Sequence, residues 1–217
     1  MRRNDARGIW AYTSAMTLTR TGVIDAGAVL ARSGHFDGVS LRRVAQQLGV
    51  TPMALYRHVG DSDALVTAVL ERVAAEIPIA AATGQWMMDL RRWAVVAREV
   101  LAGYPGASSR LLTVWFKLPS MLVQVEQLLA VVEQADLDDF ESVASTNAVL
   151  MFVLMRVEAE RVVRGAGVTR RTLRVNATGD LTRLRRLTAF YEAAQLDTHF
   201  EYGLDVLLAG ISTRGER

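Results

Sequence analysis

The 217-residue sequence contains no cysteine, and this absence removes several classes of protein at once. A disulfide scaffold, a thiolate metal site and a cysteine nucleophile are all excluded. Proline is scarce as well, with four residues, and the 16 glycines leave long stretches without either residue. Such stretches favour helices over short strands joined by turns. Because 51% of the residues are hydrophobic, we expect an all-α protein with a sizeable core.

Histidine is also rare, and its three positions share no helical spacing: His35, His58 and His199. A histidine metal site is therefore not expected. Neither Glu-x-x-His nor His-Glu-x-x-His occurs, and no Ser-His-acid arrangement is suggested. Glu158 and Glu160 lie two residues apart, so a helix would not place them on one face. We expect no enzyme activity, no metal and no cofactor.

Long hydrophobic runs are missing too. The longest uncharged stretch, residues 142–155, is shorter than the ~20 residues that a membrane-spanning helix needs. Arg2 and Arg3 follow Met1, but no apolar run comes after them, so we expect no signal peptide. These features predict a soluble, cytoplasmic protein, and the lack of thiol chemistry fits a reducing compartment.

Charge is distributed unevenly although the net charge is only +2. Residues 1–60 contain eight Arg and three Asp, whereas residues 120–160 contain eight acidic residues and one basic residue, Arg156. A basic segment joined to a neutral or acidic remainder is typical of a protein whose basic end binds nucleic acid.

Residues 40–59 have the pattern of a helix-turn-helix. Ser40 is a good N-cap for a first short helix. Gly49 stands where that helix must end and the chain must reverse, which favours a residue that tolerates the left-handed conformation. Thr51 and Pro52 then suit the N-cap and first position of a second short helix. Ala45 is small enough for the two helices to cross closely.

Flanking helices complete this unit. We expect one helix to begin at Thr19 and end at residues 33–34, and another, capped by Asp61 or Ser62, to reach about Glu76. Residues with helical spacing then form a small shared core: Val23, Leu30, Leu41, Leu48, Leu55, Leu65 and Val69.

Residues 19–76 resemble the tetracycline-repressor-like (TetR) family of bacterial regulators. The resemblance lies in Leu-Gly-Val-Thr-Pro (48–52), Leu-Tyr-Arg-His-Val (55–59) and Asp-Ala-Leu (63–65). Phe-Glu-Tyr-Gly-Leu-Asp (200–205) is similar to the last dimerisation helix of that family. The resemblance implies a flexible basic arm (1–18), a DNA-binding domain (19–76) and a helical effector-binding and dimerisation domain (80–217).

The resemblance also assigns candidate DNA contacts. The second short helix should enter the major groove, with Arg57 reading guanine or binding a phosphate. Ser62 stands where many relatives have a lysine, and Asp61 and Asp63 beside it oppose a phosphate. The alternatives are that Arg42 and Arg43 form a solvated face and that Tyr56 is a core aromatic. The full set of candidates is Arg20, Thr21, Ser40, Arg42, Arg43, Thr51, Pro52, Met53, Ala54, Tyr56, Arg57, His58 and Ser62.

The second domain should contain helices near residues 86–101, 107–117, 120–135, 138–164 and 197–211, with a mobile loop at 165–179. Apolar and polar side chains there are candidates for lining an effector pocket, although a plain core is the alternative. Gln124 is a further polar candidate. No histidine occurs between Glu76 and Asp197, so we do not expect a tetracycline–magnesium inducer. The candidate pocket residues are Trp86, Trp93, Tyr104, Trp115, Phe116, Asn147, Met151 and Met155.

Two chains are expected to pair through residues 138–164 and 197–211. The resemblance then implies a homodimeric repressor of a quasi-palindromic DNA operator, responsive to an unknown small-molecule effector. The Arg-rich residues 161–186 form a solvated surface, a second DNA contact or an entrance for an anionic ligand. The alternative function is a helical scaffold or ligand-binding protein whose helix-turn-helix does not read DNA.

Overall fold

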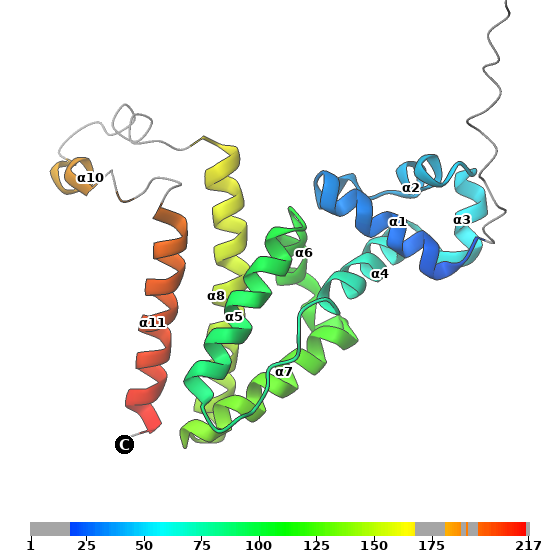
Figure 1. The fold of residues 1–217 in the computed structure, drawn as a ribbon. Helices are drawn as coiled ribbons and strands as arrows, with labels where there is room; N and C mark the ends of the chain where they lie inside the picture. The colour runs from blue at the N-terminus through cyan, green and yellow to red at the C-terminus, as the bar shows by residue number, and fades with distance from the viewer. Residues whose placement is uncertain (1–17, 168–180, 188–189, 191–194, 216–217) are drawn as a thin grey trace, which may run out of the picture.

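The computed structural model describes residues 18–167, 181–187, 190 and 195–215, and every regular element within these ranges is helical. The prediction of an all-α protein is therefore confirmed for the described chain. The N-terminal helices form a head that lies to one side of a larger helical body (Figure 1). The elements of the head are α1 (Arg20–Ser33), the 3₁₀ helix η1 (Phe36–Gly38), α2 (Leu41–Leu48), α3 (Pro52–Val59) and α4 (Ser62–Ala74).

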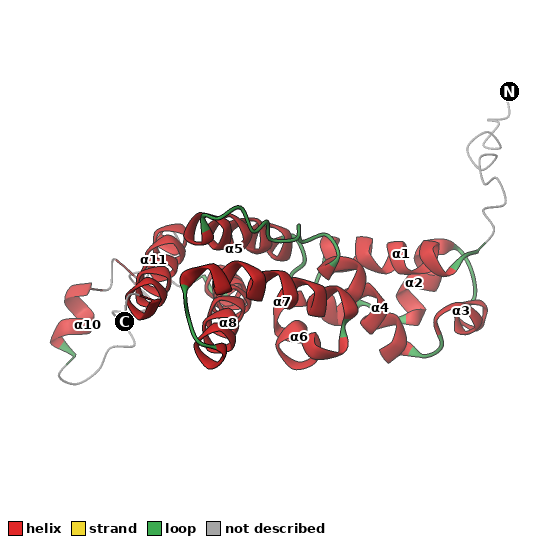
Figure 2. Cartoon of the chain, turned by 90° about the horizontal axis from the view of Figure 1, so that it is seen from below, coloured by secondary structure: helices red, strands yellow, loops and turns green. Residues whose placement is uncertain are grey.

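The body begins after an extended segment and is built from longer helices. Its elements are α5 (Trp86–Ala102), α6 (Ala107–Val114), η2 (Trp115–Lys117), α7 (Pro119–Val132), η3 (Glu133–Ala135), α8 (Asp139–Gly165), α10 (Thr182–Leu187) and α11 (Leu196–Gly215). Figure 2 shows α5, α7, α8 and α11 stacked side by side, with the head continuing from the far end of α7. Helix α10 is a six-residue element that the sequence pattern did not predict, and α11 is longer than expected.

The head has a core of small and branched side chains. Val23, Leu55, Leu65 and Val69 are completely buried, as predicted, whereas Leu30 and Leu48 are only partly buried. Gly27 sets the crossing of α1 over α4, because a Cβ atom on it would lie 2.6 Å from Cγ2 of Val69. Helices α1 and α4 therefore approach closely at Gly27, where a larger residue would clash with Val69.

Helix α8 is the centre of the body. It packs against α5, α6, α7 and α11, and its N-cap is Asp138, whose carboxylate accepts a hydrogen bond from the Glu141 amide at 2.7 Å. Among the described residues, α8 is the one helix long and apolar enough to cross a membrane. A buried core helix passes the same test, and the contacts of α8 with four neighbours are those of a core helix.

Helix α4 packs against α6 and α7, and further contacts between head and body lie at the α5–α6 turn and the start of α6. The Phe36 amide donates to the Pro105 carbonyl at 2.7 Å, and Arg110 pairs with Asp37 at 2.7 Å. The Tyr104 hydroxyl donates to Glu76 at 2.8 Å and accepts from Arg32 at 2.6 Å. The sequence predicts Tyr104 as a pocket residue, whereas its hydroxyl group is bonded within this head–body joint.

Two predicted segments lie largely outside the described residues. They are the basic arm at residues 1–18, of which the structure describes Leu18, and the loop at residues 165–179, of which it describes residues 165–167. The Arg-rich segment 161–186 is described only in part, at residues 161–167 and 181–186.

Candidate DNA-binding surface

The turn between α2 and α3 has the geometry expected from its sequence. Gly49 adopts φ 68° and ψ 27°, in the left-handed region, where a side chain would be strained. Its amide bonds to the carbonyls of Ala45 and Gln46 and ends α2. The Val50 amide also donates to Ala45, at 3.0 Å. This turn sends α3 across α2, so that α3 lies at the outer end of the head (Figure 1).

Helix α3 buries one face and exposes the other. Leu55 and Val59 point into the core of the head, whereas Met53 is 77% exposed. Tyr56 is 50% exposed, so the alternative of a core aromatic is wrong for this side chain. Arg57 is exposed and forms no side-chain hydrogen bond or ion pair with any described residue. The outer face of α3 is thus available to a partner.

Thr51 and Pro52 stand at the start of α3. Pro52 occupies a first-turn position, as predicted, and Thr51 is the N-cap. The Thr51 hydroxyl, however, makes no capping hydrogen bond. This differs from the predicted capping role and leaves an exposed hydroxyl group at the N-terminal end of α3.

His58, one of the candidate DNA contacts, is not on the fully exposed face of α3. It is only partly exposed, and its Nε2 atom is buried without a hydrogen-bond partner among the described residues. Ala54 is likewise partly buried. The helical register explains both positions, because residues 54 and 58 flank the buried Leu55 and Val59 on the surface of α3.

The two arginines of α2 have different surroundings. Arg43 donates a hydrogen bond to the Gly38 carbonyl at 3.2 Å and lies back over η1. Arg42 is exposed and has no such partner within the described chain. The Ser40 hydroxyl caps α2 by accepting from the Arg43 amide at 3.4 Å. Of these three residues, Arg42 is the one whose charged group is left for an external anion.

The first turns of α1 and α4 border the same end of the head. Arg20 and Thr21 are exposed in the first turn of α1, directly after the N-cap Thr19. Asp61 caps α4 by accepting from the Ala64 amide at 2.8 Å, so Asp61 and not Ser62 fills this position. Ser62 is exposed between two exposed aspartates, whose negative charges weaken its attraction for phosphate.

The residues expected to line an effector pocket have different surroundings in the structure. Trp93 is buried and donates to Gln124 at 2.8 Å, and Gln124 donates to the Ile77 carbonyl at 2.6 Å. Phe116, Asn147 and Met155 are exposed on the single chain. Trp86, Trp115 and Met151 are partly buried. Their role in ligand binding stays a prediction.

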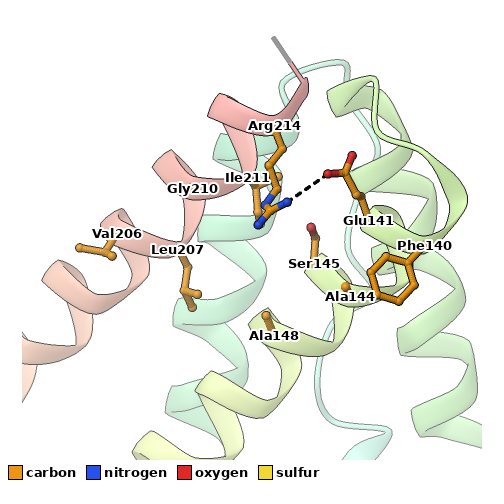
Figure 3. Close-up of a pocket in the computed structure, with 10 residues that line it drawn as sticks. All are labelled: Phe140, Glu141, Ala144, Ser145, Ala148, Val206, Leu207, Gly210, Ile211 and Arg214. Atoms are coloured by element: carbon orange, nitrogen blue, oxygen red, sulfur yellow. Dashed lines mark hydrogen bonds and ion pairs between the residues drawn. The ribbon is translucent and has the colours of Figure 1, made fainter. Parts of the chain in front are cut away.

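A groove of about 300 Å³ lies between α8 and α11. Figure 3 shows Val206 and Leu207 on one side and Ala144, Ala148 and Phe140 on the other. An ion pair of 3.1 Å between Glu141 and Arg214 spans its end. None of the eight predicted pocket residues lines this groove.

A short exposed helix, held against a second helix by a left-handed glycine turn, defines the class of helix-turn-helix proteins. Comparison with known proteins narrows this class to one family. A family model described as tetracyclin repressor-like, C-terminal domain, matches residues 77–214. The chain therefore belongs to the tetracycline-repressor-like (TetR) family, as its sequence resemblance predicted.

Two curated relatives carry regulator names. The repressor DrrR1 of Streptomyces coeruleorubidus is 38% identical over 90 residues, which are 41% of this chain and 32% of that protein. A transcriptional regulator of Saccharopolyspora erythraea is 26% identical over 201 residues, 90% of this chain and 85% of that protein. The chain thus matches about a third of the length of DrrR1, whereas the match to the second relative covers most of both chains.

The fold is shared with solved structures. Apo ActR from Streptomyces coelicolor superposes with a TM-score of 0.78 at 20% identity, over 92% of this chain and 97% of that one. At this identity the likeness concerns the fold, and the residues of the candidate surface must be judged on their own geometry.

Proposed function

We propose that this protein is a sequence-specific DNA-binding transcriptional regulator, most simply a repressor, that acts as a homodimer and responds to a small molecule. The observation that carries the proposal is the outer face of α3, where Thr51, Met53 and Arg57 are exposed and unused by the chain's own fold. Relatives named as transcriptional regulators support it. BioQ, which shares the fold, has been solved with its double-stranded DNA operator.

In this proposal α3 enters the major groove and its side chains contact base edges. Arg57 can donate two hydrogen bonds to a guanine, Thr51 can bond to a base edge or a phosphate, and Met53 can contact a thymine methyl group. Arg20 and Arg42 bind phosphates, which fix the register of the head without reading sequence. Arg43 is the weaker candidate because it already bonds to Gly38.

The dimer would form through α8 and α11. Both helices expose large apolar side chains on the single chain, among them Phe140 at 79%, Met155 and Tyr202. Exposed apolar area of this kind favours burial against another copy. A twofold dimer would present two α3 helices to half-sites one turn of DNA apart, roughly 34–36 Å.

The domain limits proposed for this function are a DNA-binding domain at 19–76 and an effector-binding and dimerisation domain at 80–217, in a cytoplasmic protein without enzyme activity. ActR has been solved in complex with actinorhodin, which supports a small-molecule effector here. Binding of an effector to the body would change the pose of the heads and so lower the affinity for DNA. By linkage, bound DNA would lower the affinity for the effector by the same factor.

The test is a selection from random duplexes followed by titration of the recovered DNA at two salt concentrations. A regulator should bind the recovered site far more tightly than scrambled DNA, with affinity that falls steeply as salt rises. The alternative is a helical scaffold whose helix-turn-helix does not read DNA. If the purified dimer recovers no sequence and binds no duplex at low salt, that alternative replaces the proposal.

A further inference from the structure

Helix α4 is the element of the head that lies against the body. It packs on α1 and α3 within the head and on α6 and α7 in the body. Figure 2 shows it between α7 and the outer helices of the head. Because α3 packs on α4, a rotation of α4 against the body moves α3 as well.

The first turn of α7 receives its hydrogen-bond acceptor from this head helix. The N-cap of α7 is Leu118, which makes no capping hydrogen bond, and Pro119 has no amide hydrogen to donate. The Ser120 amide is therefore the first free donor of the helix. It donates to Oε1 of Glu71 at 2.9 Å, and the Ser120 hydroxyl donates to the same oxygen at 2.6 Å. A carboxylate on α4 thus caps a helix of the body, at the end where negative charge is favourable.

This contact defines a position more than it adds stability. The second carboxylate oxygen of Glu71, Oε2, is buried and has no hydrogen-bond partner among the described residues. A buried acceptor without a donor is unfavourable, and this cost offsets part of what the two bonds to Oε1 contribute. The two bonds are short and directional, so they fix where α4 lies on the first turn of α7.

A second carboxylate attaches the end of α4 to a different part of the body. Glu76 accepts a hydrogen bond from the buried Tyr104 hydroxyl in the α5–α6 turn, and it pairs with Arg32 of α1 at 3.0 Å. It also pairs with Arg72 at 2.8 Å, and Arg72 reaches Asp25 of α1 at 3.3 Å. Two attachments to two different body elements restrain both the sliding and the rotation of α4.

We propose that Glu71 is a positioning residue for DNA recognition, which caps α7 and thereby selects the half-site spacing that the two heads of a dimer can bind together. Glu76 and Tyr104 provide the second attachment. The inference rests on the proposed function, since spacing has a meaning only for a dimer that binds DNA.

The physical reason lies in how two linked heads bind. One head binds one half-site whatever the pose of the other. The second head then binds at an effective concentration that depends on whether its pose matches the spacing. A looser α4 lowers that concentration at the matching spacing and raises it at other spacings, while the affinity for one half-site stays the same.

The experiment compares four duplexes: the selected operator, the same operator with one base pair inserted or removed between its half-sites, and a duplex with one half-site scrambled. Glu71→Ala should lower the affinity for the operator about tenfold and reduce the penalty for altered spacing by a similar factor. Its affinity for the single half-site should equal that of the parent protein. Equal losses on the operator and on the single half-site would mean that Glu71 only supports the fold of the head, and this would overturn the proposal, as would unchanged binding to all four duplexes.

Two further variants serve as controls. Glu126→Ala removes an exposed glutamate of α7 that forms no side-chain hydrogen bond or ion pair with the described residues, and it should behave as the parent on every duplex. Glu71→Gln keeps an oxygen that can accept both bonds from Ser120, and it should retain the spacing preference. Loss of the preference in Glu71→Gln would overturn the assignment to these hydrogen bonds.

A measurement without DNA separates this inference from the proposed function. The chain has no cysteine, so spin labels can be placed at Gln47→Cys in the head and Glu99→Cys in the body, two exposed positions. Double electron–electron resonance on labelled chains, diluted with unlabelled chains, then gives the distance between head and body. The distribution of distances should broaden in Glu71→Ala, and further in Glu71→Ala/Tyr104→Phe, but not in Glu126→Ala. An unchanged distribution in the double variant would overturn the positioning role, whereas failure of the parent to bind DNA would overturn the proposed function.

Discussion

The head and the body use their polar side chains in opposite ways. On the outer face of α3 and α2, Thr51, Arg42 and Arg57 are exposed and form no side-chain bond with the described chain. In the body, several polar side chains bond to one another, as in the buried Trp93–Gln124–Ile77 chain and in the Arg98–Glu160 pair, which the exposed Asp197 joins at the surface. The difference teaches that the head is shaped for an external partner, whereas the body is shaped by internal contacts.

The largest effect should come from the core of the head. Leu55 is fully buried where α3 packs on its neighbours. Leu55→Ala should cost ~2–5 kcal/mol of local stability, because the short helices around it cannot easily close the cavity. Amide hydrogen exchange should then be fast throughout residues 20–74, with loss of DNA binding, while the amides of α8 stay protected. Equal loss of protection in α8 would show that head and body unfold as one unit.

A buried polar pair tests the body in the same way. Gln124 is 2% exposed and bonds to both Trp93 and the Ile77 carbonyl. Gln124→Leu leaves two buried polar groups without partners, at a cost of ~1–3 kcal/mol. Urea unfolding followed by tryptophan fluorescence measures this cost. Operator affinity should stay nearly unchanged, and a large loss of affinity at full folding would mean that the body pair also sets the pose of the head.

Arg57 tests the assignment of base reading. Arg57→Ala should cost ~1–3 kcal/mol of binding to the selected site and relax the preference at one base pair. Binding titrations against single-base variants of the site provide the measurement. If the substitution weakens every duplex equally, Arg57 binds a phosphate and does not read guanine.

The arginine pair of α2 gives a matched comparison. Arg42→Ala should weaken binding to all sequences alike and reduce the slope of log affinity against log salt by about 1. Arg43→Ala should change that slope less, because the Arg43 side chain bonds to Gly38. Titrations of both variants at several salt concentrations compare them directly. Equal slopes would show that Arg43 leaves Gly38 when DNA binds.

The smallest effect concerns the ion pair at the joint. A hydrogen bond from Arg110 holds the pKa of Asp37 below its ordinary value. A carboxylate of this kind stabilises the fold at pH values above its unfolded pKa of about 3.9 and loses that contribution as pH falls through the folded value. Both side chains are about half exposed, so Asp37→Asn should cost well under ~1 kcal/mol. Thermal unfolding at pH 7 and pH 3 measures this, and the difference between variant and parent should shrink at the lower pH.

Elements defined by local chemistry could be predicted from the sequence. Four helices begin where capping or first-turn preferences place their starts, at Thr19, Ser40, Pro119 and Asp138. Helix α2 ends at Gly49, whose backbone can adopt the left-handed conformation. These signals act over three or four residues, so a single sequence contains all the information they need.

Contacts between distant residues could not be predicted in this way. The Asp37–Arg110 pair spans 73 residues and the Arg98–Glu160 pair spans 62, and no local pattern marks either one. Phe36 is nearly fully buried, although it is not among the core residues that helical spacing predicts. The partly buried His58 likewise depends on how α3 is rotated against its neighbours. The sequence therefore predicts which residues form the candidate DNA-binding surface. How exposed each of them is, and what it bonds to, is seen only in the packed structure.

Helix α8 runs without a break for 27 residues, which at 1.5 Å per residue is ~40 Å. The C-terminal end of α8 lines a cavity together with the α5–α6 turn, and the N-terminal end lies at the groove shown in Figure 3. A continuous helix of this length behaves as a stiff rod, so a tilt imposed at one end reappears at the other with little attenuation. Substitutions in the middle of α8 that make the helix more flexible, such as a change to glycine, would thus affect both ends of the helix without contacting either end.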